Sequence, residues 1–319
     1  MGLTLEGVRN NLDYVQLIDA SIYIFQSHFS SNIECADNNG NDLSALYGFT
    51  QFLIQFIRRI KPKYVAVAHD QSLFTGFRHN LCENYKSNRE LPDENLAMQL
   101  QGCSEVSNIL GLTSFKSTIY EADDIIGTLA RNIRLEDKLT AIQIISKDKD
   151  LAQLLETDAD CLWDYSANRR RYRKDILKEF GVLPEKIPDY LGLVGDSVDC
   201  IKGIPGIGPV KAKVLLQELG SLEGIYTDLE KVKTLPIRGA KNLALKINEN
   251  KELAYLSKTL ATIVCSITEP NESFGSASKE SLTTDMINKS LFSDFLNRYD
   301  FRRNEKEQLN RLVSSTISF

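Results

Sequence analysis

The segment from Gly195 to Ala212 combines residues that can bind a metal ion with residues that can bind a phosphate. Asp196 and Asp199 are three positions apart, so in a helix both would project from one face and could serve one hard cation or its water shell. Three glycines follow them: Gly203, Gly206 and Gly208. With Pro205 among them and Pro209 directly after them, these glycines predict a tight turn whose backbone can approach a partner closely.

A helix is predicted directly after this turn, from near Pro209 to Leu219. Its first turn has free N–H groups and carries Lys211 and Lys213, so it can bind an anion such as phosphate. For any one of these features, a plain helix–turn–helix connection with solvated carboxylates is the simpler interpretation. Together, the acidic pair, the glycine turn and the basic helix start favour a phosphate clamp of the helix–hairpin–helix kind, with metal ligands beside it.

Acidic residues also follow three apolar segments in the first half of the chain. These segments have the length of strands and span residues 14–18, 64–68 and 141–145. Helical periodicity at 46–60 and 122–133 separates them, which favours right-handed crossovers in a parallel sheet. Ligands bind outside the carboxyl ends of such strands. The predicted fold therefore places four aspartates at one rim: Asp19, Asp70, Asp148 and Asp150.

A further acidic group stands at the start of the helix predicted at 122–133, and consists of Glu121, Asp123 and Asp124. Taken alone, this group is explained by helix capping. Residues 147–150 are likewise explained as a charged loop, in which positive and negative side chains nearly cancel. Neither explanation accounts for so many carboxylates at one sheet edge, where bound cations would relieve their repulsion. An oxygen-only ligand set favours Mg²⁺ or Mn²⁺ over zinc. His69 points away from the face of Asp70 and is assigned a structural role.

The loop after the second predicted strand interleaves basic and aromatic residues, namely Phe74, Phe77, Arg78, His79, Tyr85, Lys86 and Arg89. Lys and Arg can neutralise phosphates, while Tyr or Phe can stack on an unpaired base. A solvated excursion over the sheet fits the composition equally well. The position of the loop after Asp70, at the same rim as the carboxylates, favours contact with nucleic acid.

Composition restricts the class of protein. The 319 residues suffice for one large or two ordinary domains, and 42% hydrophobic and 25% charged residues are typical of a globular protein. Six cysteines without a Cys-x-x-Cys pair argue against a disulfide scaffold and a structural zinc site. Residues 1–12 lack a signal-peptide core, and no apolar run could span a bilayer, so we expect a cytoplasmic protein. The net charge of −5 is weak evidence against nucleic-acid binding, because bound cations would invert the field of clustered acids.

The remaining segments carry weaker signals. The basic run at 164–175 predicts either a hairpin that touches duplex phosphate or a solvated turn. Later segments are predicted as a helix beginning in 220–226, one or two amphipathic helices in 239–261, an exposed return segment at 266–284, a final helix at 286–299 and a mobile tail at 303–319.

In their order along the chain, these residues resemble the bacterial 5′-3′ exonuclease or flap endonuclease family, which includes the N-terminal nuclease domain of DNA polymerase I. The motifs that carry the resemblance are Asp19, Asp70, Phe77-Arg78, Tyr85-Lys86-x-x-Arg89, Tyr120-Glu-Ala-Asp-Asp124, Ser146-Lys-Asp-Lys-Asp-Leu, Gly195-Asp-x-x-Asp199 and Gly-Ile-Pro-Gly-Ile-Gly-Pro. They cover nearly the whole chain. Since no polymerase domain follows, we expect a stand-alone member.

The resemblance implies two metal clusters that hold two Mg²⁺ or Mn²⁺ ions. The residues that hold or orient the first ion are Asp19, Asp70, Glu121, Asp123 and Asp124. Those around the second ion are Asp148, Asp150, Asp196 and Asp199. Such a pair of ions would activate a water for attack on the phosphate and steady the leaving 3′ oxygen.

The resemblance also gives Lys86 and Arg89 catalytic roles in a helical arch, where they position the scissile phosphate and stabilise its developing charge. It implies DNA contacts, with a K⁺ ion at the glycine turn. The residues assigned to DNA binding are Arg78, Tyr85, Gly203, Gly206, Gly208, Lys211 and Lys213. Where the family often has Asn-Ile-Pro-Gly, this chain has Cys200-Ile-Lys202-Gly203, so we expect weaker ordering of Asp199.

The implied fold is an α/β domain of PIN-like or resolvase-like type, with a parallel sheet flanked by helices, and a smaller all-helical helix–three-turn–helix domain. We expect the nuclease domain at 13–170, with its arch at about 74–95, and the DNA-binding domain at 171–265. Residues 266–319 would form the return segment, the final helix and the mobile tail. The implied activity is metal-dependent, structure-selective hydrolysis of DNA, as a 5′-3′ exonuclease and 5′-flap endonuclease in replication and repair.

The implied substrate is DNA with 5′ flaps, nicks, gaps or branches. We expect a monomer without membrane contact, in the cytoplasm and associated with the nucleoid, that meets replication and repair proteins. Two alternatives stay open: a non-catalytic binder of branched DNA that uses the glycine turn and the arch, and a ribonuclease that shares the α/β core. The nine acids favour an active enzyme, and the segment 195–212 disfavours the ribonuclease.

Overall fold

The computed structural model describes residues 13–72 and 74–317, which form two compact units. The first unit contains residues up to 73 together with 91–146 and those from 265 onward. The second contains 74–90 and 147–264. Within the described ranges, no helix combines the length and the apolar character needed to cross a membrane. The expectation for residues 1–12 lies outside the described residues.

The first unit is built on four parallel strands: β1 (Tyr14–Asp19), β2 (Tyr64–Asp70), β3 (Thr113–Ser117) and β4 (Ala141–Ile145). They lie in the order β3-β2-β1-β4. Most residues of β1, β2 and β4 are buried, as expected for parallel strands covered on both faces. The register pairs Asp19 with Ala68 and Asp70 with Ser117, so these strands end at one edge. The parallel arrangement predicted for β1, β2 and β4 is confirmed.

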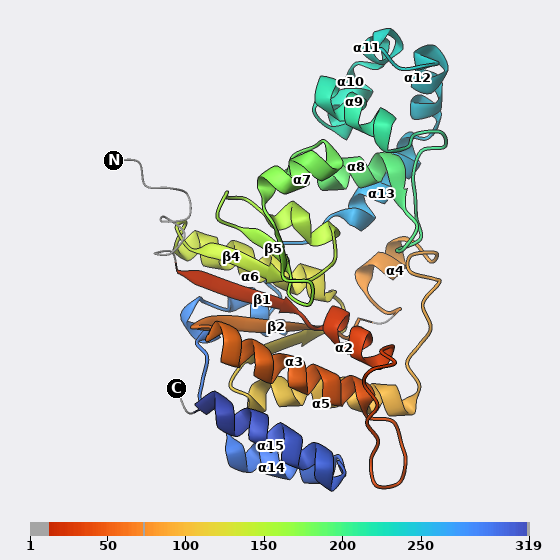
Figure 1. The fold of residues 1–319 in the computed structure, drawn as a ribbon. Coiled ribbons are helices and arrows are strands. Elements are labelled where there is room, and N and C mark those ends of the chain that lie inside the picture. The colour runs from red at the N-terminus through yellow and green to blue at the C-terminus, as the bar shows by residue number, and fades with distance from the viewer. Residues whose placement is uncertain (1–12, 73, 318–319) are drawn as a thin grey trace. The chain divides into compact units, whose positions relative to one another are not determined.

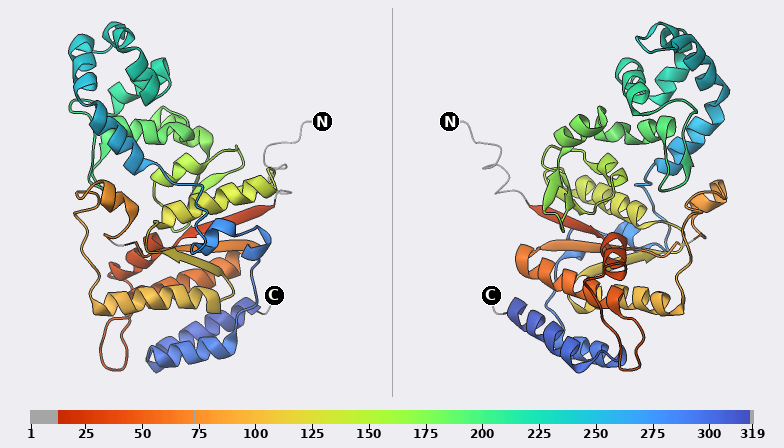
Figure 2. Two further views of the ribbon diagram at one scale, coloured as in Figure 1. Left: turned by 180° about the vertical axis from the view of Figure 1, so that it is seen from behind. Right: turned by 45° about the vertical axis from the view of Figure 1, so that its right-hand side comes forward.

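The helices around this sheet are α2 (Ala20–His28), α3 (Ser44–Ile60), α5 (Glu94–Ile109) and α6 (Ala122–Glu136). The C-terminal helices are α14 (Lys289–Arg298) and α15 (Arg303–Ile317). Figure 1 shows α6 on one face and α3 and α5 on the other. The helices predicted at 46–60 and 122–133 are confirmed as α3 and α6. The two C-terminal helices pack on this layer, α14 against α5 and α15 against α3 (Figure 2).

The C-terminal expectations are wrong in two places. Residues 303–317 are helix α15 rather than a mobile tail, because Leu309 and Val313 on its apolar stripe are buried, and the final helix is therefore α15. The segment 266–284 is not exposed throughout. It contains two 3₁₀ helices, η3 (Ser273–Ser276) and η4 (Glu280–Leu282), and the ring of the fully buried Phe274 lies 6.4 Å from that of Phe115.

The second unit contains short strands and many helices. Its elements are α4 (Phe77–Leu81), η1 (Asp150–Leu154), β5 (Cys161–Asp164), β6 (Arg169–Arg171), α7 (Arg173–Phe180), η2 (Pro184–Lys186), α8 (Ile187–Val194), β7 (Gly195–Asp196), β8 (Ile201–Lys202), α9 (Pro209–Leu219), α10 (Leu222–Thr227), α11 (Leu229–Thr234), α12 (Ala240–Glu249) and α13 (Lys251–Ala261). Strands β5 and β6 form an antiparallel hairpin, which was one of the two possibilities for the basic run. The helices predicted in 220–226 and 239–261 are confirmed.

Asp196 and Asp199 do not lie on a helix. Residues 195–202 form the antiparallel pair β7–β8, in which Asp196 faces Ile201. Gly195 has a φ of +74°, and a Cβ at this position would lie 2.3 Å from the backbone nitrogen of Gly203. The backbones around Gly195 and Gly203 therefore lie in contact, which only a residue without a side chain permits, and this close approach allows the hairpin. Helix α9 begins and ends at the predicted residues.

Candidate active site

Asp19 ends β1 and caps α2 at the carboxyl edge of the sheet in the first unit. Its Oδ1 accepts a hydrogen bond from the Ser21 N–H at 3.2 Å, and its Oδ2 accepts one from the Ser146 hydroxyl at 2.8 Å. The residue is only 4% exposed. Both oxygens are thus held in place by hydrogen bonds at the edge where ligands of such sheets bind.

The neighbouring acids of the first unit are fixed by their own backbone. Asp70 Oδ1 accepts from the Ser72 N–H at 3.1 Å and from the Ser72 hydroxyl at 2.9 Å. Glu121 and Asp124 form a capping box at the start of α6, in which Asp124 Oδ2 accepts from the Glu121 N–H at 3.1 Å. Capping, the simpler interpretation of this group, is therefore present. Asp123, which lies between them in sequence, is partly exposed.

In the second unit, Asp148 and Asp150 are arranged by one tight turn. Asp148 Oδ1 accepts from the Asp150 N–H at 2.8 Å, and the buried Asp150 begins η1. Burial and then the Asp148 charge raise the pKa of Asp150 to about 7, although Lys149 opposes them. Within the described residues, Asp150 Oδ1 has no hydrogen-bond partner. A buried carboxylate oxygen without a hydrogen bond is costly unless a cation lies near it, and here that cation is the Lys149 ammonium, 3.3 Å away.

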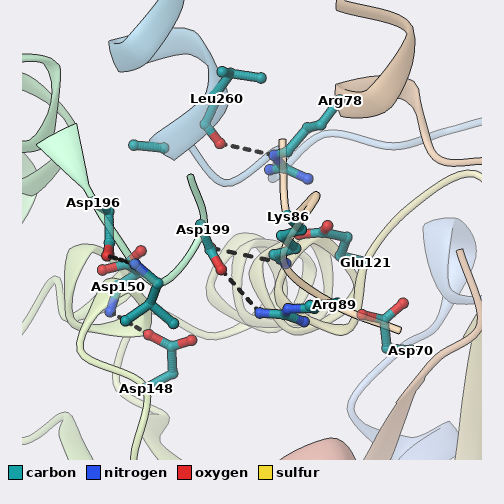
Figure 3. Close-up of polar contacts among 12 residues, drawn as sticks. Asp70, Arg78, Lys86, Arg89, Glu121, Asp148, Asp150, Asp196, Asp199 and Leu260 are labelled. Carbon is teal, nitrogen blue, oxygen red and sulfur yellow. Dashed lines mark hydrogen bonds and ion pairs between the residues drawn. The ribbon is translucent and has the colours of Figure 1, made fainter. Parts of the chain in front are cut away.

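Lys149 bridges the carboxylates of Asp150 and Asp196. Its Nζ lies 3.3 Å from Asp150 Oδ1 and also donates to Asp196 Oδ2, while Asp196 Oδ1 accepts from the Val198 N–H at 2.9 Å. Burial alone would lower the pKa of Lys149, but the two carboxylates outweigh it and raise that pKa. Figure 3 shows Asp148, Asp150 and Asp196 gathered around this position. The chain thus places a positive charge of its own between two of the predicted metal ligands.

Asp199 contacts both of the predicted catalytic cations (Figure 3). Arg89 Nη2 donates to Asp199 Oδ1 at 2.9 Å, and Lys86 Nζ lies 3.9 Å from Oδ2. The Lys86 N–H also donates to the backbone carbonyl of Asp199 at 3.0 Å. The fold of the second unit therefore brings the predicted arch cations to a predicted metal ligand that is more than a hundred residues away in sequence.

The acids do not form a preformed set of metal ligands. Over residues 13–72 and 74–317, no group of three or more His, Cys, Asp or Glu side chains is placed to hold a metal ion. In the second unit, Lys149 and Arg89 instead draw carboxylates into ion pairs. The donor chemistry nevertheless fits a hard divalent ion, because all donors are oxygens and Asp150 offers a buried oxygen without a hydrogen bond.

The raised pKa of Asp150 predicts that the metal-free protein loses stability as the pH rises. The pKa of this carboxyl is about 7 in the folded protein, against an ordinary value of 3.8, so the folded state binds more protons than the unfolded state between these two pH values. The stability that this group contributes is therefore complete below about pH 4, declines as the pH rises from there, and is lost by about pH 8. Asp150→Asn should flatten this dependence when urea unfolding is followed in EDTA. Identical pH profiles for the two proteins would contradict the assignment.

Two of the predicted DNA-contacting residues are buried within the second unit. Arg78 is 3% exposed, and its guanidinium donates to the carbonyls of Leu260 at 2.9 Å and Thr262 at 2.8 Å. The ring of the buried Tyr85 meets the edge of His79, with centroids 5.4 Å apart. We propose that Arg78 anchors the segment 74–90 rather than contacting DNA. Base stacking by Tyr85 stays a prediction and requires the ring to become exposed.

The glycine turn has the predicted form. Gly206 has a φ of +86°, and Lys211 Nζ donates to its carbonyl at 2.8 Å. Lys213 Nζ donates to the Glu179 carbonyl at 3.1 Å. Gly208 is the N-cap of α9, and a Cβ there would meet nothing within 4 Å, so sterics do not require glycine at this position. The DNA contacts assigned to these residues stay predictions.

Sequence reasoning missed Ser146 and Lys149. From the sequence, Lys149 was interpreted as a charge that cancels its acidic neighbours. In the structure it bridges Asp150 and Asp196, and Asp196 is 47 positions further along the chain than Lys149. The sequence signal for this role was a lysine that stands between two aspartates shortly after a strand, as Lys149 does after β4. Ser146 directly follows β4 and donates to Asp19, so a small hydroxyl at the end of a central strand was the signal there.

The fold and the acidic residues define a resolvase-like α/β domain followed by a SAM-like helical domain. The model of the 5′-3′ exonuclease N-terminal resolvase-like domain matches residues 14–183, and that of the 5′-3′ exonuclease C-terminal SAM fold matches 182–278. The 5′-3′ exonuclease of Buchnera aphidicola subsp. Acyrthosiphon pisum is 34% identical over 259 residues, which cover 80% of this chain and 87% of that protein. The chain therefore belongs to the 5′-3′ exonuclease family.

Two solved structures share the fold. The T5 5′-exonuclease with divalent zinc ions bound is 16% identical with a TM-score of 0.61, over 95% of this chain and 99% of that one. The catalytic core of Rad2 in complex with DNA substrate is 15% identical with a TM-score of 0.58, over 98% of this chain and 94% of that one. At these identities, they confirm the predicted fold class of an α/β domain with a helical domain.

Proposed function

We propose that this chain is a structure-selective 5′ nuclease that hydrolyses DNA phosphodiester bonds with two divalent metal ions. Membership of the 5′-3′ exonuclease family supports the reaction. The metal ions in the T5 5′-exonuclease and the DNA in the Rad2 complex support the cofactor and the substrate. The observation that carries the proposal is the acidic cluster of the second unit, where Asp150 and Asp196 share one lysine ammonium, Asp148 lies beside Asp150, and the pKa of Asp150 is raised.

The metal ligands are proposed as two groups, one from each unit. Asp19, Asp70, Glu121, Asp123 and Asp124 would hold or orient one ion, and Asp148, Asp150, Asp196 and Asp199 the other. When bound, such ions lower the pKa of a water and stabilise the leaving oxygen. Magnesium is favoured, with manganese as its substitute, because the donors are oxygens. Lys149 neutralises part of the second group through its ion pairs with Asp150 and Asp196.

Lys86 and Arg89 are proposed to act on the phosphate that is cleaved. Their contacts with Asp199 hold both cations beside a proposed metal ligand before substrate arrives. A guanidinium and an ammonium at this place can stabilise the negative charge that gathers on the phosphate oxygens in the transition state. They need not transfer a proton for this role.

The glycine turn is proposed to hold the DNA backbone together with a K⁺ ion. A Cβ at Gly206 would meet only Lys246 Nζ, at 3.5 Å, so a partner can approach the backbone there, whereas the space at Gly203 is taken by the backbone of Val194. Lys211 and Lys213 at the start of α9 add positive charge. The Lys211 ammonium on the Gly206 carbonyl supports a cation position at this turn.

The proposed substrates are 5′-flapped, nicked, gapped or branched duplexes in DNA replication and repair. We propose a monomer that works in the bacterial cytoplasm with the nucleoid and meets replication and repair proteins there. The non-catalytic alternative is not favoured. Binding of DNA alone does not require acids such as Asp19 at a sheet edge, or an acid such as Asp199 that pairs with Lys86 and Arg89.

The proposal is tested with a 5′-flap DNA labelled at its 5′ end. We expect the purified chain to release short labelled fragments with Mg²⁺ or Mn²⁺ and to release none in EDTA. Cleavage that is equal in EDTA would contradict metal dependence. Binding of the flap without any cleavage in either metal would favour the non-catalytic alternative.

A further inference from the structure

The β5–β6 hairpin and helix α7 line a depression of about 520 Å³ in the second unit, whose lining residues are Arg169, Arg170, Arg171, Asp175, Lys178 and Glu179. We infer that this arginine depression is a further binding site, for the sugar-phosphate backbone of duplex DNA. The inference rests on the proposed function. It assigns a DNA contact that the acidic groups, the arch and the glycine turn do not supply.

The charges of the lining leave basic groups in excess. Both acids already have partners within the protein. Glu179 Oε1 lies 3.5 Å from Arg171 Nη1, and Asp175 Oδ2 accepts a hydrogen bond from the Tyr172 N–H at 2.9 Å. Arg169 and Lys178 are exposed and, in the part of the chain that the structure describes, form no ion pair with an acidic side chain. An anion in the depression would therefore meet uncompensated positive charge.

Two of the arginines are held in place by the protein. The Arg170 guanidinium carbon lies 3.6 Å from the centroid of the Trp163 ring, directly across the hairpin. Stacking uses the face of the guanidinium and leaves its in-plane N–H donors available for phosphate oxygens. Arg171 is 8% exposed, and its Nη2 donates to the Lys147 carbonyl at 3.4 Å. Such fixed donors lose little conformational freedom when a phosphate binds.

The lining favours a duplex over a single strand. Single-stranded nucleic acid is usually bound by exposed aromatic rings on which bases stack. No aromatic side chain belongs to the lining of this depression, and Trp163 beneath Arg170 is only 1% exposed. The available contacts are charged donors for phosphate oxygens, which fix position without reading sequence. A regular double-stranded backbone meets these requirements without base stacking.

The test compares a double variant with a control of equal charge. Arg169→Gln with Lys178→Gln removes two exposed cations that take part in no ion pair, so the fold should be kept, as checked by thermal melting. Arg58→Gln with Arg131→Gln removes two exposed arginines from helices of the first unit. Dissociation constants are measured by fluorescence anisotropy in EDTA, for a 5′-flap duplex and for a single strand of equal length, over a range of salt concentrations.

We expect the first variant to bind the duplex about fivefold to tenfold more weakly near physiological salt. The slope of log Kd against log salt should fall by about 2, and binding of the single strand should change little. The control should stay within about twofold of wild type. In Mg²⁺, KM for the flap should rise while kcat is kept. Arg170→Gln should weaken duplex binding in the same direction.

Three results would overturn the inference. Unchanged duplex affinity in a wild-type protein that binds and cuts the flap would remove this site and leave the proposed nuclease function intact. An equal loss in the control variant would assign the effect to overall charge. A wild-type protein that neither binds nor cuts the flap would remove both the site and the proposed function.

Discussion

Asp148→Asn should lower the rate of 5′-flap cleavage about a thousandfold while flap binding in EDTA stays close to wild type. Asparagine keeps an oxygen that can accept the Asp150 N–H, which lies 2.8 Å from Asp148 Oδ1. The turn into η1 should therefore persist, and the change removes a negative charge from the proposed ligand group. Single-turnover cleavage in Mg²⁺ is the measurement.

The matched control is Asp164→Asn. Like Asp148, Asp164 is an aspartate of the second unit that follows apolar strand residues. Asp164 Oδ1 accepts from the Ala167 N–H at 3.1 Å, so asparagine can keep this turn bond too. We expect this control to cleave within about twofold of wild type. Wild-type turnover by the Asp148 variant would exclude Asp148 as an essential ligand.

Lys86→Met should lower kcat by about 100-fold to 1,000-fold with a small change in KM. Methionine keeps most of the aliphatic stem of this buried side chain and removes the ammonium that lies 3.9 Å from Asp199 Oδ2. The backbone φ of +50° at Lys86 is equally unfavourable for both residues, so the backbone should not distinguish them. Steady-state cleavage of the 5′-flap DNA measures the effect.

Lys138→Met is the control for this charge, because Lys138 is exposed in the first unit and is absent from the proposed site. A loss in kcat for Lys86→Met alone supports a role in the transition state. If KM rises while kcat is kept, Lys86 contributes to substrate binding only, and its catalytic assignment is wrong.

The fold of the first unit could be predicted from the sequence where one periodicity dominates. β1, β2 and β4 are apolar runs, and α3 and α6 show helical spacing, so all five elements were found. β3 was missed because Thr-Ser-Phe-Lys-Ser has one large apolar residue and takes its strand form from pairing with β2. The α15 stripe was missed because the composition of this helix is polar overall.

The candidate site was predictable in its residue types but not in its contacts. Strand ends and the glycine turn identified the acids and their neighbourhood. The hairpin at 195–202 could not be foreseen, because its cause is a backbone approach between Gly195 and Gly203. The ion pairs of Lys149 and Arg89 also depend on long-range contacts that no local pattern encodes.

The central claim is that the acids of both units bind two divalent ions, although Lys149 and Arg89 neutralise several of them in the metal-free chain. The most direct measurement is the number of Mn²⁺ ions bound per chain at saturation, from electron paramagnetic resonance of free manganese. Two ions for wild type and one for Asp148→Asn are predicted. No bound manganese in wild type, or two ions that bind the Asp148 variant with unchanged affinity, would contradict this account.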